Sequence, residues 1–386
     1  MIPYSRQSIN KIDIKNVIKV LKSDYITQGQ TVKKFEEKIC SIVKAKYVVA
    51  SNSATSSLHI SCLALGLKKN DWLWTSANTF VASANCGRYC GANVDFVDID
   101  EDTFNISVDK LKQKLIKAKR KKILPKILVV VHFGGEPVNL HEIYKLSKKY
   151  KFKIIEDASH ALGSKYRGLP IGKPKYSEII CFSFHPVKPI TTAEGGVSVT
   201  NNFELAKKMR LLRNHGITRD TKDLNKKIKN YWYYEQKDLG YNYRMNDLEA
   251  SLGLSQLKKL SIFTKKRQLI AKRYLQLLKN LPVKFQKVDS KNYSSYHLFV
   301  VCLNLKIIKK NYNYIFEYLR EKKIGVNKHY LPVYSHPYYK SSKKYKKLKH
   351  VEKYASSALS LPIYYDLTFK QQVYVAKTLE QVLKNK

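Results

Sequence analysis

Between about residues 45 and 200, short runs of β-branched and other apolar residues alternate with longer segments whose apolar positions recur every three or four residues. The short runs are typical of buried strands, and the longer segments are typical of amphipathic helices. The expected strands are KYVVA (46–50), NVDFVDI (93–99), KILVVVH (126–132), FKIIED (152–157), EIICFSF (178–184) and GGVSVT (195–200). The alternation predicts an α/β fold built on a doubly wound, mostly parallel sheet with helices on both faces.

The pattern changes past about residue 245. One long helical pattern runs from Asn246 to about Leu278 and leads into a smaller α+β region. This region contains a strand at YHLFVVCL, a helix at IIKKNYNYIFEYLREKK and a last helix from Thr368. A chain of 386 residues is long for one domain, so two domains that share a cleft are expected. We predict a large domain at 1–245 and a small domain at 246–386.

Composition narrows the class of protein. Hydrophobic residues make up 44% of the chain, and the mean hydropathy is −0.39. The sequence has no uncharged apolar run of roughly 18 residues and no apolar segment near its first residue. We therefore expect a soluble cytoplasmic protein without membrane attachment. The six cysteines lie mostly in apolar runs, so free thiols are expected, with no metal site.

The net charge of +42 raises nucleic-acid binding as an alternative function, because lysine readily neutralises phosphate. The cations are spread over the whole chain, and no helix-turn-helix, RNA-recognition or zinc-finger pattern is present. A specific nucleic-acid partner is therefore not expected. The charge remains compatible with attraction of an anionic substrate to a cleft.

Two strand ends carry candidate chemistry, because ligands of doubly wound sheets bind at the carboxyl ends of the strands. Asp157 ends the strand FKIIED, and Lys188 follows the strand EIICFSF between Pro186 and Pro189. The prolines stiffen this loop, and the following ITTAEGGVSV contains no other cation. Such surroundings favour a lysine of depressed pKa that acts as a nucleophilic amine, although an ordinary surface lysine remains the alternative.

A third strand end adds a possible anion site. The strand KYVVA leads into SNSATSSLHIS, whose hydroxyls and free amides suit either a simple helix cap or a bound phosphate. Together with Asp157, Ser183 and Lys188, this loop matches one ligand, pyridoxal 5′-phosphate. The lysine would take its aldehyde, the carboxylate its ring nitrogen, and the hydroxyls and amides its phosphate.

The same stretches resemble the sugar aminotransferases of the DegT/DnrJ/EryC/StrS family, which are fold-type I pyridoxal-phosphate enzymes. The resemblance is collinear over essentially the whole chain. It is carried by DYITQGQTVKKFEEKI (24–39), TFVASANC (79–86), EDASHALGSKYRG (156–168), FSFHPVKPITTAEGGVSVTNN (182–202), GYNYRMNDLEASLGLSQLKKL (240–260) and KHYLPVY (328–334).

The resemblance implies a role for each residue of the cofactor site. Lys188 would bind the cofactor covalently and then carry the proton during transfer, and Asp157 would keep the ring nitrogen protonated. Phe80 would stack on the ring, and His160 would support the ring oxygen or Asp157. The residues expected at the phosphate are Ala54, Thr55, Ser183 and, from a neighbouring subunit, Asn242, which implies a homodimer with shared active sites.

The resemblance also implies a substrate class. Family members that replace the lysine by histidine dehydrate a sugar, so Lys188 implies transamination of a nucleotide-linked keto-sugar with glutamate as donor. The motifs are most similar to those of members in pseudaminic acid biosynthesis, which aminate C4 of UDP-2-acetamido-2,6-dideoxy-β-L-arabino-hexos-4-ulose. Alternatives are members of the GDP-perosamine or UDP-4-amino-arabinose type and a non-catalytic cofactor-binding regulator. The implied sugar-nucleotide contacts are Tyr4, Thr27, Gln28 and His329.

Overall fold

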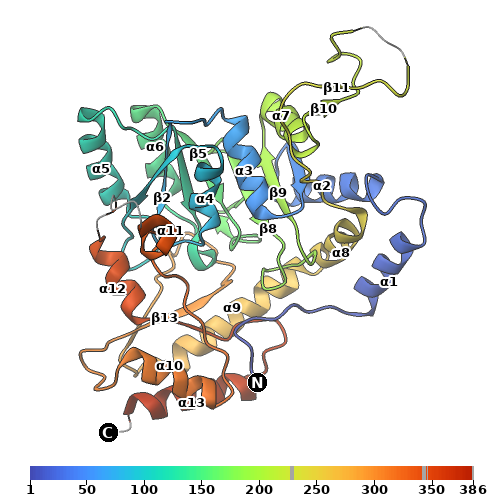
Figure 1. Ribbon diagram of the computed structural model, residues 1–386. Coiled ribbons are helices and arrows are strands. Elements are labelled where there is room, and N and C mark those ends of the chain that lie inside the picture. The colour runs from blue at the N-terminus through green and yellow to red at the C-terminus, as the bar shows by residue number, and fades with distance from the viewer. Residues whose placement is uncertain (227–229, 341–344, 346, 385–386) are drawn as a thin grey trace.

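The computed structural model describes residues 1–226, 230–340, 345 and 347–384 (Figure 1). Its centre is a seven-stranded sheet in the order β1-β9-β8-β5-β4-β2-β3. The strands are β1 (Tyr47–Ser51), β2 (Trp72–Ser76), β3 (Asn93–Val97), β4 (Ile127–Val131), β5 (Lys153–Asp157), β8 (Ile179–Ser183) and β9 (Gly196–Thr200). Strand β9 is antiparallel to β1 and β8, whereas the pairs from β8 to β3 are all parallel. The predicted mostly parallel sheet is confirmed.

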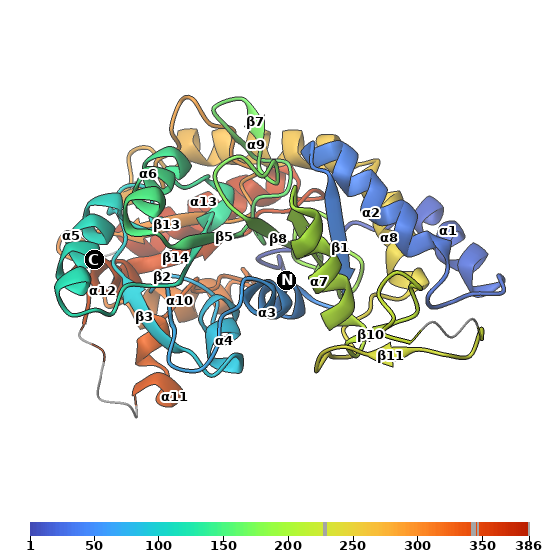
Figure 2. The same ribbon diagram turned by 90° about the horizontal axis from the view of Figure 1, so that it is seen from above.

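Helices cover both faces of this sheet, as predicted (Figures 1 and 2). Alternate strand residues pack to opposite sides, with Leu128 and Val130 in one apolar core and Ile127 and Val129 in the other. The first core is covered by α2 (Gln30–Val43), α5 (Val108–Arg120), α6 (Leu140–Tyr150), α8 (Asp247–Leu257) and the start of α9 (Leu260–Leu277). The second is covered by α3 (Ala54–Ala64), α4 (Ala82–Tyr89) and α7 (Phe203–Arg213).

The structure differs from the prediction at two places. Strand β2 was not predicted, because WLWTS is only five residues long and contains a single β-branched residue, so it lacks the β-branched run that marked the other strands. The single helix expected from Asn246 to Leu278 is two helices, α8 and α9, because α8 ends in a cap at Lys258 and α9 starts at Leu260.

The C-terminal part forms a three-stranded sheet, covered by helices, below the central sheet in Figure 1. The first residues of the chain join it, because Ile2 pairs with Ile324 and the Tyr4 carbonyl accepts the Ile363 N–H at 3.0 Å. The division into 1–245 and 246–386 stays a prediction. The elements are β12 (Val283–Phe285), β13 (Phe299–Leu303), β14 (Ala358–Leu361), α10 (Tyr312–Glu321), η2 (Val333–Ser335), α11 (Pro337–Lys340), α12 (Lys349–Ser357) and α13 (Phe369–Lys384).

The remaining short elements lie outside the two sheets just described. An arm that contains β10 (Ile217–Thr218) and β11 (Glu235–Gln236) projects from the body in both views, and α1 (Lys11–Leu21) packs on α8 (Figures 1 and 2). Near the end of β5 lie η1 (Phe133–Gly135), β6 (Lys165–Tyr166) and β7 (Leu169–Pro170). Every described helix is too short or too polar to cross a membrane. All six cysteines are free thiols, as predicted.

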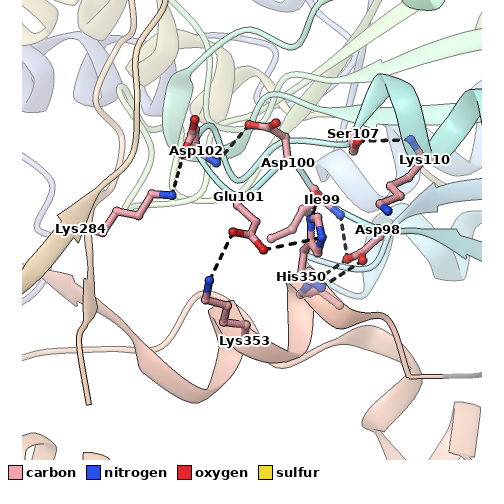
Figure 3. A network of polar contacts seen from close by, with 11 residues as sticks. Asp98, Ile99, Asp100, Glu101, Asp102, Ser107, Lys110, Lys284, His350 and Lys353 are labelled. Carbon is pink, nitrogen blue, oxygen red and sulfur yellow. Dashed lines mark hydrogen bonds and ion pairs between the residues drawn. The ribbon is translucent and has the colours of Figure 1, made fainter. Parts of the chain in front are cut away.

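An acidic segment after β3 fastens the C-terminal part to the central sheet (Figure 3). The Asp98 carboxylate is buried and accepts the backbone N–H groups of His350 and Val351 at 3.0 and 2.9 Å. These groups belong to the first turn of α12, where no carbonyl of the same helix is available to them. Asp98 therefore caps a helix that lies about 250 residues further along the chain.

Two ion pairs flank this cap. Glu101 pairs with Lys353 at 3.3 Å, and Asp102 pairs with Lys284 at 2.6 Å (Figure 3). Both lysines are largely exposed, so each pair contributes little to stability on its own. The Asp98 cap is consequently the main polar contact in this network.

Candidate active site

Lys188 lies in the loop between β8 and β9. The loop is closed at its base by Phe184, whose carbonyl accepts the Thr192 N–H and whose N–H bonds the Gly195 carbonyl, both at 2.9 Å. The Lys188 N–H bonds the His185 carbonyl at 2.9 Å, which forms a tight turn between the prolines. Burial lowers the pKa of the Lys188 amine to about 8, and the negative charge of Asp157 opposes this shift. The amine is therefore partly neutral near neutral pH.

Asp157 ends β5 and is 5% exposed. One carboxylate oxygen accepts the Ser83 hydroxyl at 2.6 Å, and the other accepts the Ser159 hydroxyl at 2.6 Å and the Ser159 N–H at 3.1 Å. Thr79 in turn bonds Ser83 at 2.7 Å. Neutral donors thus fix the carboxylate in place without cancelling its charge, which stays available to a cationic ligand.

His160 lies three residues after Asp157 and is buried. Its Nδ1 accepts the Gly134 N–H at 3.3 Å, and its Nε2 lies 3.2 Å from the Tyr330 hydroxyl. Burial and the nearby Lys188 charge hold the pKa of the imidazole well below its usual range. His160 is therefore neutral at physiological pH.

Phe80 and Tyr330 provide aromatic surface beside His160. The Tyr330 ring stacks on His160 at an interplanar angle of 20°, and Phe80 is tilted against Tyr330 with ring centroids 6.1 Å apart. Phe80 is 56% exposed, which leaves one surface of its ring available to a flat ligand.

The N-terminus of α3 lies against the start of β9. Ser53 caps this helix through the Ser56 N–H at 3.1 Å, whereas the Ala54 and Thr55 amides are in the first turn and have no carbonyl partner within the helix. Gly196 is paired with Ser51 and Ser183, and a Cβ at Gly196 would overlap the Ala54 nitrogen. Glycine is required for this close approach, which makes a cradle for an anion at the helix N-terminus.

These features fit pyridoxal 5′-phosphate. A partly neutral lysine amine suits its aldehyde, a fixed carboxylate suits its ring nitrogen, and an exposed aromatic ring suits its face. The glycine-bounded helix N-terminus suits its phosphate.

The structure brings Tyr4 and His329 to the same region. Their ring centroids are 5.4 Å apart, and His329 Nδ1 bonds the Ser360 hydroxyl at 2.7 Å. The His329 ring centroid lies 5.0 Å from that of Tyr330, and burial and the charge of Lys188 lower the pKa of His329 to about 3. Tyr4 also lies close enough to Tyr330 to raise the pKa of that phenol.

Three predicted residues lie elsewhere in the chain. Thr27, Gln28 and Asn242 are exposed, and the described hydrogen bonds and ring contacts link none of them to Lys188. Gln28 lines a separate cavity of about 1480 Å³ together with Arg213 and Arg244. The described contacts thus connect only part of the predicted site within one chain.

Sequence reasoning missed Ser83, Ser159 and Tyr330. Ser159 follows Asp157 by two residues, a spacing that suits a local side-chain hydrogen bond and was a usable signal. Ser83 and Tyr330 come from α4 and from the segment before η2, and only the fold brings them to Asp157 and His160.

Comparison with known proteins identifies the class. The chain matches the model of the DegT/DnrJ/EryC1/StrS aminotransferase family over residues 7–380 and belongs to this family. It is 39% identical to the UDP-4-amino-4,6-dideoxy-N-acetyl-beta-L-altrosamine transaminase of Campylobacter jejuni, covering 99% of this chain and 98% of that protein.

Solved structures agree with this assignment. Helicobacter pylori PseC, an aminotransferase involved in the biosynthesis of pseudoaminic acid, has a TM-score of 0.89 at 31% identity, with 99% of each chain covered. The PLP form of the putative sugar aminotransferase Spr1654 from Streptococcus pneumoniae has a TM-score of 0.88 at 26% identity, covering 99% of this chain and 98% of that one. The protein is a pyridoxal-phosphate-dependent aminotransferase of the fold-type I class.

Proposed function

We propose that the protein transfers an amino group from L-glutamate to C4 of UDP-2-acetamido-2,6-dideoxy-β-L-arabino-hexos-4-ulose. The product would be UDP-4-amino-4,6-dideoxy-N-acetyl-β-L-altrosamine. The observation that carries the reaction type is the Lys188 amine, of lowered pKa, close to the fixed carboxylate of Asp157. The sugar is inferred from the names of the Campylobacter and Helicobacter relatives.

The Lys188 cluster consists of Lys188, Asp157, Phe80 and the neighbouring Tyr330 and His160, and its residues have separate roles in this proposal. Lys188 holds the cofactor and then moves the proton away from the donor's α-carbon, for which a pKa of about 8 is well suited. Asp157, oriented by Ser83 and Ser159, keeps the ring nitrogen protonated. When bound, the cofactor supplies an electron sink for the pair left on carbon. Phe80 covers one face of the ring.

The phosphate cradle and the second subunit are part of the same proposal. Ala54, Thr55 and Ser183 bind the phosphate at the start of α3, supported by the close approach of Gly196. Asn242 completes this site from a second copy of the chain. This role is supported by the exposure of the Asn242 side chain on its own chain, which leaves it accessible to a second copy.

Exposed apolar residues of α1, its following segment and the projecting arm also favour a dimer. Tyr231 and Trp232 of the projecting arm are 101% and 70% exposed, and Ile12 and Tyr25, at and beyond α1, are 62% and 66% exposed. Exposed aromatic and aliphatic side chains of this size are typical of protein interfaces.

The sugar nucleotide would contact four residues. Tyr4 and His329 lie beside the Lys188 cluster in the same chain, which supports a role at the sugar. Thr27 and Gln28 would approach from the second subunit, because they lie apart from Lys188 in their own chain.

A substrate panel tests the reaction. Purified protein with cofactor and glutamate is offered UDP- and GDP-linked 4-keto sugars, and mass spectrometry scores the amino sugar and 2-oxoglutarate. We expect the UDP-N-acetyl substrate to be aminated fastest, with Lys188→Ala as the inactive control. Preference for a GDP-mannose or UDP-arabinose derivative would reject the proposed sugar. A cofactor-loaded protein whose absorbance glutamate leaves unchanged would reject enzymatic function altogether.

Subunit complementation tests the shared site. Lys188→Ala and Asn242→Ala are each expected to lose activity, and the mixed, re-associated sample should regain about one quarter of wild-type activity. This follows because half of the dimers are mixed and each mixed dimer holds one intact site. Absence of recovery in a sample shown by mass spectrometry to contain mixed dimers would contradict the contribution of Asn242 in trans.

A further inference from the structure

The hydrogen bonds around His160 have a fixed direction. The Gly134 backbone N–H is a donor only, so His160 Nδ1, at 3.3 Å, must be an acceptor. Because the imidazole is neutral, its single proton is then on Nε2. The partner of Nε2 is the Tyr330 hydroxyl, at 3.2 Å, which must therefore accept this proton.

This direction leaves the Tyr330 hydroxyl proton free to donate elsewhere. A phenol can accept and donate at the same time, and the bond to His160 is the only hydrogen bond of this hydroxyl among the described residues. The Tyr330 backbone N–H bonds Asn78 Oδ1 at 3.1 Å, which holds the residue in place. Burial and the charge of Asp157 raise the pKa of the phenol above its usual value, so it stays protonated.

The residues around this hydroxyl are those proposed to hold the cofactor ring. Phe80 contacts the Tyr330 ring and His160 stacks on it, while the charge of Asp157 acts directly on the phenol. The other ionisable groups that act on this pair are Tyr4 on Tyr330 and Lys188, His132 and His329 on His160. The His297 ring is tilted against that of His160, with ring centroids 4.4 Å apart. A pyridoxal ring bound among Phe80, Asp157 and Lys188 presents one anionic oxygen, next to the carbon that bears the aldehyde.

We propose that Tyr330 donates its hydroxyl proton in a hydrogen bond to the ring oxygen of the bound cofactor. His160, itself fixed by the Gly134 N–H, acts as the positioning residue that makes the hydroxyl a donor. The inference rests on the proposed roles of Lys188 and Asp157 in cofactor binding.

The consequence is spectroscopic. A hydrogen bond to the ring oxygen stabilises its negative charge. The charge then attracts the proton on the nitrogen that links lysine and cofactor less strongly, so the pKa of this nitrogen is lower. Tyr330→Phe should therefore raise the midpoint of the visible absorbance titration of the bound cofactor by about one pH unit, the size expected for one hydrogen bond to a charged group. The dissociation constant for pyridoxal 5′-phosphate should rise about tenfold.

The matched control is Tyr334→Phe, in the same segment. Its hydroxyl donates to Glu352 at 2.9 Å, away from the cluster, so both its titration midpoint and its cofactor affinity should equal those of wild type. His160→Gln retains an acceptor for Gly134 and a donor for Tyr330 and should stay close to wild type. His160→Leu removes both and should shift the midpoint in the same direction as Tyr330→Phe.

The outcomes separate the proposals. A wild-type protein that binds no cofactor would overturn the proposed function itself. If wild type binds normally but Tyr330→Phe keeps both midpoint and affinity, Tyr330 does not bond the ring oxygen and this inference fails. It also fails if the only change is a higher KM for the keto-sugar, because Tyr330 would then act on the substrate.

Discussion

Glu136 offers the sharpest test of how burial controls charge in this protein. It lies directly after η1 and is 1% exposed. One carboxylate oxygen accepts the Asn292 amide at 2.8 Å and the Asp289 N–H at 3.2 Å, whereas the other has no partner among the described residues. Burial raises the pKa of Glu136 to about 7, from an ordinary value of 4.5.

The sign and size of the stability effect follow from this shift. Below pH 4.5 the carboxyl is protonated in both the folded and the unfolded chain, so no penalty arises. Between pH 4.5 and about 7, Glu136 is ionised in the unfolded chain but still largely protonated in the folded chain. The free energy of unfolding therefore falls progressively over this range. Above pH 7 the full penalty applies, and 2.5 pKa units correspond to about 3 kcal/mol.

Glu136→Gln removes the charge and keeps an oxygen that accepts from Asn292 and Asp289. We expect the variant to gain about 2.5 kcal/mol in free energy of unfolding relative to wild type as the pH rises from 5 to 8, because a small part of the penalty is already present at pH 5. The assay is urea unfolding of the cofactor-free protein, followed by tryptophan fluorescence at several pH values. Exposed Glu37→Gln serves as the control and should show little change with pH. A difference between Glu136→Gln and wild type that is constant over this range would refute the reasoning.

Three further predictions concern the cofactor site and the Asp98 cap of α12. Asp98→Ala should lower the free energy of unfolding by about 1–2 kcal/mol, because α12 loses its cap, and hydrogen exchange should increase first in α12; unchanged exchange there would contradict the capping role. Gly196→Ala should weaken cofactor binding about tenfold or more with unchanged circular dichroism, because its Cβ would displace the start of α3; wild-type affinity would show that the cradle tolerates a methyl group. Covalent attachment of the cofactor to Lys188 should accelerate about tenfold per pH unit up to pH 7 and level off above about 8, measured by stopped-flow absorbance; a rate that still rises steeply above pH 9 would show an ordinary lysine.

Sequence alone predicted those parts of the molecule whose signal is local. Strands with β-branched runs were located, and Asp157 and Lys188 became candidate site residues because Asp157 ends one predicted strand and Lys188 lies shortly after another strand of the same sheet. Strand β2 lacked such a run. The contact of Tyr330 with His160 could not be predicted from the sequence, because the two residues are 170 positions apart. Only the packing of the C-terminal part on the sheet brings them together.

The same limit applies to Asp98, which in the sequence is one of several acidic residues after a strand. Its function as a helix cap depends on α12, and no local pattern encodes that pairing. The roles of Thr27, Gln28 and Asn242 stay predictions, since they depend on a second subunit.

The long-range cap also sets the order in which the enzyme becomes functional during its synthesis. Asp98 leaves the ribosome early, but its partner Val351 follows 253 residues later. At a translation rate of about 5–20 residues per second, about 10–50 s pass between the synthesis of Asp98 and that of Val351. Helix α12 also holds His329, because the Tyr354 hydroxyl donates to the His329 carbonyl. This part of the candidate site therefore forms only when nearly the whole chain has been translated, so a ribosome-bound or truncated chain would present Lys188 without His329 held in its place.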